Sequence, residues 1–144
     1  MLNYINEINS FEIWVVLQIV VAILLGGILG WQREQRGKHA GPRTYALVTS
    51  GAALFTALSI HAFGNNMAPV AAGIVTGIGF LGAGMILHHE NQIEGLTTAA
   101  GLWMTAAIGM AIGVGYYFLA VCTTVLILLV LMLNDQKFKK EIKE

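Results

Sequence analysis

Long apolar stretches separated by short polar breaks make up most of the chain. The hydrocarbon core of a bilayer is about 30 Å thick, so a helix that crosses it needs roughly 20 mostly apolar residues. The first such stretch covers residues 13–31 and ends at the most polar segment, residues 32–41. Because proline suits the first turn of a helix, a second helix is expected from Pro42 to about Phe63.

Two further apolar stretches follow. Residues 64–66 carry a turn signal of one glycine and two asparagines, and a third helix is predicted over residues 68–87. Residues 96–133 are almost wholly apolar and about twice the length of one span. The chain must therefore turn inside this stretch, and Gly113 and Gly115 are the expected place.

These stretches predict an all-α fold, a polytopic transmembrane helix bundle of about five spans. A β-barrel would instead show alternating segments of roughly ten residues. Residues 1–133 form the expected transmembrane domain, and residues 134–144 form a basic tail. We expect the first stretch to be retained as a membrane helix, because residues 1–12 lack the positive charge of a secretory signal.

Composition supports the membrane class. The 144 residues are 56% hydrophobic and 11% charged, whereas soluble domains are about 25% charged. So few charges cannot cover a soluble surface, and so much apolar content excludes disorder. Eight Lys and Arg balance eight Asp and Glu, so the basic excess of a nucleic-acid-binding protein is missing. The lone Cys122 excludes an intrachain disulfide and a cysteine metal cluster.

The positions of the basic residues predict the orientation. Lys and Arg accumulate in short cytoplasmic loops, and all eight lie either in or beside the first polar break or in the tail. Five spans place these two segments on the same side of the membrane. The chain is therefore expected to lie in the membrane with its N-terminus outside and its C-terminus in the cytoplasm.

Small residues recur at the four-residue spacing that lets membrane helices pack closely. The first helix has Gly26 and Gly30, and the third has Gly73 and Gly77. The expected fourth helix carries a longer ridge, so we expect it to lie at the centre of a tightly packed bundle. Its members are Thr97, Gly101, Thr105, Gly109 and Gly113. A ridge that the monomer leaves unused could mediate self-association.

Residues 77–82 match the pattern G-x-G-x-x-G. This pattern binds dinucleotides only between a strand and a helix, and here it lies inside an apolar membrane stretch. Two structural interpretations stay open, a helix surface thinned for packing and a locally unwound helix that lines a cavity. We expect no enzyme activity and no cofactor, because no serine or threonine has an evident acidic or histidine partner.

The first polar break is the best candidate for a site. Arg33, Glu34, Arg36 and Arg43 lie together at the cytoplasmic interface, whereas no carboxylate falls at mid-membrane depth. One interpretation is anchoring by anionic lipid. The other is a surface that binds a phosphate-bearing ligand or a partner. Mg²⁺ prefers one or two carboxylates as ligands, and the carboxylates nearest the membrane are on the cytoplasmic side. The sequence does not identify a metal.

Two long segments of this chain resemble the MgtC/SapB family of bacterial membrane proteins. The first runs from Gly30 to Thr44, and the second combines residues 77–84, 95–100, 102–103 and 106–109. Gln32 stands where the family pattern has an acidic residue, which weakens a cation site at that position. Some members add a soluble C-terminal domain, so the resemblance is to the short form without it.

The resemblance implies a protein of the bacterial inner (plasma) membrane that is linked to Mg²⁺ limitation and stress survival. Thr97 and Thr98 lie in the second segment and join the candidate ligand or partner surface. Glu94 joins it as a cytoplasmic carboxylate beside that segment, at a position where the family often has a basic residue. Members are often described as transporters, and one is thought to act on the F-type ATP synthase. The expected partners are thus the lipid bilayer and either a second copy or another membrane protein, with no nucleic acid.

Two functions therefore compete. The first is regulation through helix contacts with another membrane complex, which the small-residue ridges and the lack of mid-membrane charge favour. The second is an oligomeric transporter or channel for Mg²⁺ or another small ion, which the family resemblance favours.

Overall fold

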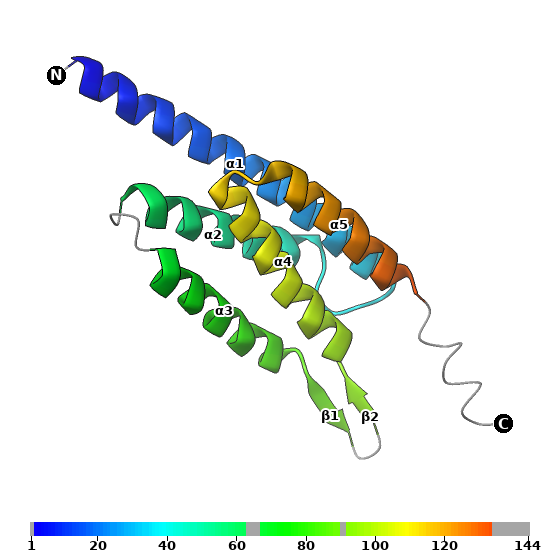
Figure 1. The fold of residues 1–144 in the computed structure, drawn as a ribbon. Helices are drawn as coiled ribbons and strands as arrows, with labels where there is room; N and C mark the ends of the chain where they lie inside the picture. Colours follow the sequence, from blue (N-terminus) through cyan, green and yellow to red (C-terminus); the bar gives the residue numbers. More distant parts are fainter. Residues whose placement is uncertain (1, 63–66, 90–91, 134–144) are drawn as a thin grey trace.

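The computed structural model describes residues 2–62, 67–89 and 92–133, and the side chains from residue 10 onward except those of residues 89 and 92. The predicted turn at residues 64–66 and the basic tail lie outside the described residues. Five helices and one short hairpin make up the described part, so the all-α membrane architecture is confirmed (Figure 1). The elements are α1 (Leu2–Gln35), α2 (Pro42–His61), α3 (Met67–Gly84), β1 (Leu87–His89), β2 (Gln92–Glu94), α4 (Leu96–Val114) and α5 (Tyr117–Met132).

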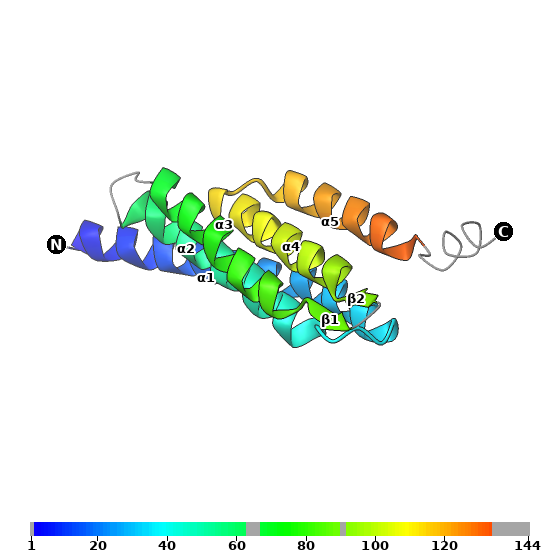
Figure 2. The same ribbon diagram turned by 90° about the horizontal axis from the view of Figure 1, so that it is seen from below.

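The described residues form five helices, as predicted, and three of these are long and apolar enough to cross a membrane by length and composition. They are α1 from Ser10 onward, α3 and α4. Helix α5 is apolar but has only 16 residues, and α2 carries several hydroxyl side chains along its 20 residues. Both lie alongside the longer helices in the same bundle (Figures 1 and 2).

Helix α1 continues past the expected boundary at residue 31, because glutamine, arginine and glutamate are good helix formers. It ends where Gly37 takes a positive φ of 63°. The N–H of Lys38 then donates to the carbonyl of Arg33, and the N–H of Gly37 donates to the carbonyl of Glu34. This is the Schellman pattern that closes many helices, and α4 ends in the same way at Gly115 (φ 92°). The predicted turn between the last two helices is thus at Gly115, whereas Gly113 lies inside α4.

The segment after α3 differs from the expectation. Helix α3 ends at Gly84 rather than at residue 87, and β1 and β2 pair antiparallel, with Leu87 opposite Glu94. Strands of three residues are too short for an alternating pattern to reveal them. The glycine-rich residues 77–82 lie inside continuous helix, so the interpretation as an unwound segment is wrong.

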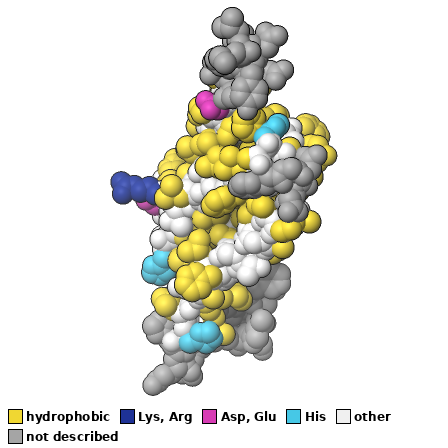
Figure 3. Space-filling view, turned by 90° about the vertical axis from the view of Figure 1, so that its left-hand side faces the viewer, with side chains coloured by type: hydrophobic (Ala, Val, Ile, Leu, Met, Phe, Trp, Pro, Cys, Tyr) yellow, Lys and Arg dark blue, Asp and Glu magenta, His cyan; other side chains and the backbone are white. Residues whose placement is uncertain are grey.

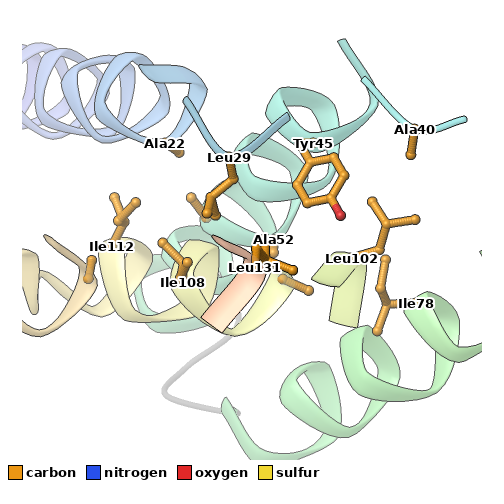
Figure 4. Packing of buried hydrophobic residues seen from close by; sticks show 13 residues of the cluster. Ala22, Leu29, Ala40, Tyr45, Ala52, Ile78, Leu102, Ile108, Ile112 and Leu131 are labelled. Atoms are coloured by element: carbon orange, nitrogen blue, oxygen red, sulfur yellow. The ribbon is translucent and has the colours of Figure 1, made fainter. Parts of the chain in front are cut away.

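Helices α2 and α4 lie at the centre of the bundle. Helix α4 contacts each of the other four helices, and α2 packs against α1, α3 and α4. Helix α3 lies at the edge of the bundle (Figure 1), and of its residues only Ile78 and Gly82 are buried. Hydrophobic side chains cover much of the described surface on the face that Figure 3 shows. The core side chains of all five helices meet between α1, α2 and α4 (Figure 4), and include Ala22, Leu29, Tyr45, Ala52, Ile78, Leu102, Ile108, Ile112 and Leu131.

We predict that Gly95→Ala destabilises the junction between the hairpin and α4. Gly95 has a φ of 86°, and a Cβ there would overlap the backbone carbonyl of Met85. The left-handed conformation alone costs a non-glycine residue roughly 1–2 kcal/mol, so we expect at least that loss of unfolding free energy in detergent. Gly84→Ala is the matched control, because Gly84 has open space around it. Equal stability of the two variants would contradict the prediction.

Candidate functional site

The candidate site lies at the end of the bundle where α1 ends and α2 and α4 begin. We call it the basic end, because Arg33, Arg36, Lys38 and Arg43 all lie there. Helix α5 also ends there, and the side-chain amide of Gln32 donates to the carbonyl of Leu131 at 3.1 Å. Four helices therefore fix the positions of the backbone around the site.

Arg33 is buried at the basic end, with only 3% of its surface exposed. Its Nη2 donates to Thr98 Oγ1 on α4 at 3.3 Å, and its guanidinium lies beside the hydroxyl of Tyr45 on α2. Its Nε is buried and has no hydrogen-bond partner. An arginine stays charged in proteins, so the basic end contains a buried cation with an unsatisfied donor.

Tyr45 completes this group, and it was missed in the sequence. The side chain is fully buried among the core residues (Figure 4), and its hydroxyl donates to the carbonyl of Thr98 at 3.5 Å. Arg33, Tyr45 and Thr98 thus join α1, α2 and α4. The only available signal was a tyrosine one turn into an apolar helix, which is common in helices without a site.

The other predicted surface residues lie apart from this group. Glu34 is exposed and faces Gly41. Together with Arg43 it lines a cavity of about 550 Å³ between the end of α1 and the first turn of α2. Arg36, Glu94 and Thr97 are also exposed. The structure therefore brings Arg33 and Thr98 together, places Glu34 and Arg43 at a separate cavity, and leaves the remaining three on the surface.

The local field at the basic end is positive. Helices α2 and α4 both point their N-termini toward this end, and neither has a side-chain hydrogen bond at its N-cap. The free N–H groups of a first turn give a helix N-terminus a partial positive charge. In the described ranges no carboxylate forms an ion pair with Arg33, and no group of three His, Cys, Asp or Glu side chains could hold a metal ion. The arrangement is suited to an anion rather than to a cation.

The glycines of α1 and α4 both pack against α2, and Gly26 and Gly109 both meet Thr49. Gly26 meets the backbone of Tyr45 and Ala46, and Gly30 meets Gly41 and Pro42. The α4 glycines meet α2 at three levels, with Gly101 at the Tyr45 hydroxyl, Gly109 at Thr49 and Ala52, and Gly113 at Ala53 and Thr56. A side chain at these positions would separate the helices.

Gly73 and Gly77 behave differently, because neither has a neighbour that a Cβ would touch. They line an apolar groove of about 540 Å³ between α2 and α3. We call this feature the α2–α3 groove. It is lined by Leu47, Val48, Gly51, Ala52, Phe55, Val70, Gly73, Ile74, Gly77, Ile78, Leu81 and Ala106. The α3 pair therefore makes no packing contact inside the described part of the monomer, contrary to its expected role in bundle packing.

Comparisons with known proteins agree with this architecture. A model described as "MgtC family" matches residues 19–139. The chain is 44% identical over 130 residues to "Putative magnesium transporter YhiD" of Escherichia coli K12, covering 84% of this chain and 60% of that protein. It is 43% identical over 113 residues to "Protein MgtC" of Salmonella typhimurium LT2, covering 78% of this chain and 49% of that protein. The chain thus spans about half to three-fifths of these relatives, and no solved structure matches it.

Proposed function

The chain belongs to the MgtC family, and on this basis we propose that it is a bacterial inner-membrane protein linked to Mg²⁺ homeostasis that acts through helix contacts with another membrane complex. The printed name of one relative refers to magnesium transport. The single observation that carries the mode of action is the α2–α3 groove. Its apolar lining includes Gly73 and Gly77, which are four residues apart and at which a Cβ would meet no atom of the monomer.

A transmembrane helix of a partner fits this groove. Small residues let two membrane helices approach closely enough for extensive van der Waals contact, which is the main source of helix association in lipid. Leu47 and Phe55 of α2 and Leu81 of α3 are half or more exposed and border the groove. They would pack around the entering helix. We further propose that the N-terminus lies outside and the C-terminus in the cytoplasm, as the basic residues suggest.

A photo-crosslinking amino acid tests this contact in cells. Placed at Leu81, inside the groove, it should capture a subunit of another membrane complex, and the F-type ATP synthase is the first candidate to probe. Placed at Leu129, an exposed residue of α5, it should not capture that subunit. Crosslinks at Leu81 only to further copies of this chain would overturn the regulatory proposal.

We predict that Gly77→Leu weakens the partner contact while the protein stays folded. The leucine would occupy the groove, and its Cβ would meet no atom of the monomer within 4 Å. We expect the crosslink at Leu81 and the growth of a complemented deletion strain at limiting Mg²⁺ both to be lost. Gly79→Leu is the control, because Gly79 also has open space but lies outside the groove. Full growth of the Gly77→Leu strain would contradict the prediction.

The second candidate function is an oligomeric transporter or channel for Mg²⁺ or another small ion. The printed name of the Escherichia coli relative favours it, and the α2–α3 groove would then hold a second copy. Purified protein in proteoliposomes should in that case carry Mg²⁺ above the level of empty liposomes. Flux at the empty-liposome level for Mg²⁺, Na⁺, K⁺ and protons would remove this candidate.

A further inference from the structure

Arg33 is a buried positive charge for which the described residues provide no counter-ion. The side chain is 97% buried, since 3% of its surface is exposed, and its positive charge persists at any physiological pH. The described residues give its terminal nitrogens a contact of 3.3 Å to Thr98 Oγ1 and the neighbouring Tyr45 hydroxyl, which are both neutral groups, and Nε has no partner. A buried charge without a counter-ion is strongly unfavourable, so an anion is needed beside this guanidinium.

The carboxylates of the described residues do not supply it. Glu34 is the nearest in sequence, but it is exposed and faces Gly41. Glu12 and Glu94 are exposed as well, and within the described ranges none of the three forms an ion pair with Arg33. The hydroxyls of Tyr45 and Thr98 are neutral, so they can orient the guanidinium but cannot balance its charge.

The helix ends around Arg33 add to the positive field. The first intrahelical bond of α4 runs from the N–H of Ala99 to the carbonyl of Gly95, so the N–H groups of residues 96–98 precede it. Helix α2 begins beside the same arginine, and neither helix has a side-chain cap. Two helix N-termini and a forked guanidinium together match the oxygens of a phosphate group, which accepts several hydrogen bonds at once.

We propose that the basic end contains an anion site in which Arg33, Thr98 and the first turn of α4 bind a phosphate group. The Arg33–Thr98 contact of 3.3 Å and the Tyr45–Thr98 contact of 3.5 Å are both long for hydrogen bonds. A phosphate oxygen can therefore exchange for them, and it would also satisfy Nε.

The phosphate has two possible sources, an acidic phospholipid and a soluble phosphate compound. Trp31 is 60% exposed and lies two residues before Arg33 on α1. Exposed tryptophans gather at the level of the lipid headgroups, and two residues of helix rise only about 3 Å. Arg33 is thus placed at headgroup depth, where both sources are within reach.

The ¹⁵N–¹H resonance of Arg33 Nε reports on the site directly. The full chain is prepared in a maltoside detergent, which contains no phosphate, and the resonance is assigned by its loss in Arg33→Lys. Titration with sodium phosphate, compared with sodium chloride at equal ionic strength and pH, should shift this resonance in a saturable way. No saturable shift with phosphate or with phosphatidylglycerol would overturn the proposal without relying on any variant.

Matched variants separate a site from general surface charge. Arg33→Gln should weaken phosphate binding about tenfold or more, the weight of one charge-assisted hydrogen bond. Arg36→Gln removes the same charge three residues away on the exposed surface, and it should leave binding within about twofold, as surface charges are screened by salt. Equal losses in both variants would mean diffuse attraction and would overturn the site.

Two further measurements distinguish a phospholipid from a soluble phosphate compound. Native mass spectrometry should show retention of phosphatidylglycerol over the matching diacylglycerol, which lacks phosphate, if a lipid is the source. Binding of inorganic phosphate without such retention points to a soluble compound, and either result supports the site.

Glu90 is a carboxylate outside the described residues, and Glu90→Gln tests whether it is the counter-ion of Arg33. If that variant alone moves the Arg33 resonance in phosphate-free detergent and phosphate does not, the proposal is overturned. Its failure would leave the proposed function intact, because the α2–α3 groove involves none of these residues.

Discussion

Replacing Gly109 with leucine should remove most of the folded protein. A Cβ at this position already overlaps the carbonyl of Thr49 and the side chain of Ala52 on α2, and the helix backbone there cannot move without separating α2 from α4. Overpacking a core typically costs about 1–3 kcal/mol, and we expect the upper end of this range or more. The loss is measured as the yield of monodisperse protein in mild detergent and as the free energy of unfolding.

Gly79→Leu provides the matched control for that experiment. It introduces the same side chain into a membrane helix, but Gly79 has no neighbour within contact distance. Surface substitutions usually change stability by less than about 0.5 kcal/mol, so this variant should match the wild type. A normal yield of Gly109→Leu protein would mean that α2 and α4 are not packed as the structure shows.

Replacing Arg33 with methionine should have the opposite profile, with loss of function and retention of the fold. Methionine has a similar length and no charge, so it removes a buried guanidinium whose described neighbours Thr98 and Tyr45 are neutral and whose Nε is unpaired. A buried charge without a counter-ion is strongly unfavourable. We expect unfolding in phosphate-free detergent to be as difficult as in the wild type or more so, while complementation at limiting Mg²⁺ is abolished.

Arg36→Met is the control for this prediction. It removes one positive charge from an exposed position on the same helix end, so both stability and complementation should stay near the wild-type level. If Arg33→Met reduced the folded yield as severely as Gly109→Leu, Arg33 would be a structural residue. Its conservative variant Arg33→Lys would then be expected to restore the yield.

The substitutions at Gly109 and Arg33 are expected to have opposite effects on stability, and this difference distinguishes a packing residue from a binding residue. The glycines between α1, α2 and α4 contact neighbouring backbone, so their contribution is to packing. Arg33 occupies a place where the fold tolerates an unfavourable charge, and such tolerance is typical of sites that bind something. This contrast is independent of which anion or partner the protein has.

The sequence was sufficient to predict the helices, because each one is a long apolar stretch and its ends carry recognisable residues. Pro42 begins α2 as expected, and Gly115 closes α4 through its positive φ. The hairpin at Leu87–Glu94 could not be predicted, because strands of three residues leave no periodicity. The extension of α1 to Gln35 was missed because polarity was taken as the end of the helix, although polar residues continue a helix readily beyond the apolar core.

The sequence also indicated the polar segment around Arg33 as the candidate site, since charges near a membrane span are few. It did not indicate which of those residues are buried. Arg33 and Glu34 are neighbours in the chain, yet one is 3% exposed and the other is on the surface. Successive side chains on a helix point about 100° apart, so only the direction of the neighbouring helices decides which one faces the interior.

The glycine pairs also show which properties the sequence determines by itself and which depend on the tertiary structure. Their four-residue spacing by itself determined that each helix has a face thin enough for close contact, and the apolar stretches determined that the contacts lie in a membrane. Only the tertiary structure decided that the faces of α1 and α4 are both covered by α2, whereas the face of α3 lines an open groove. A local pattern specifies what a helix surface can do, but its partner is set by the arrangement of all five helices, which depends on contacts between residues far apart in the chain.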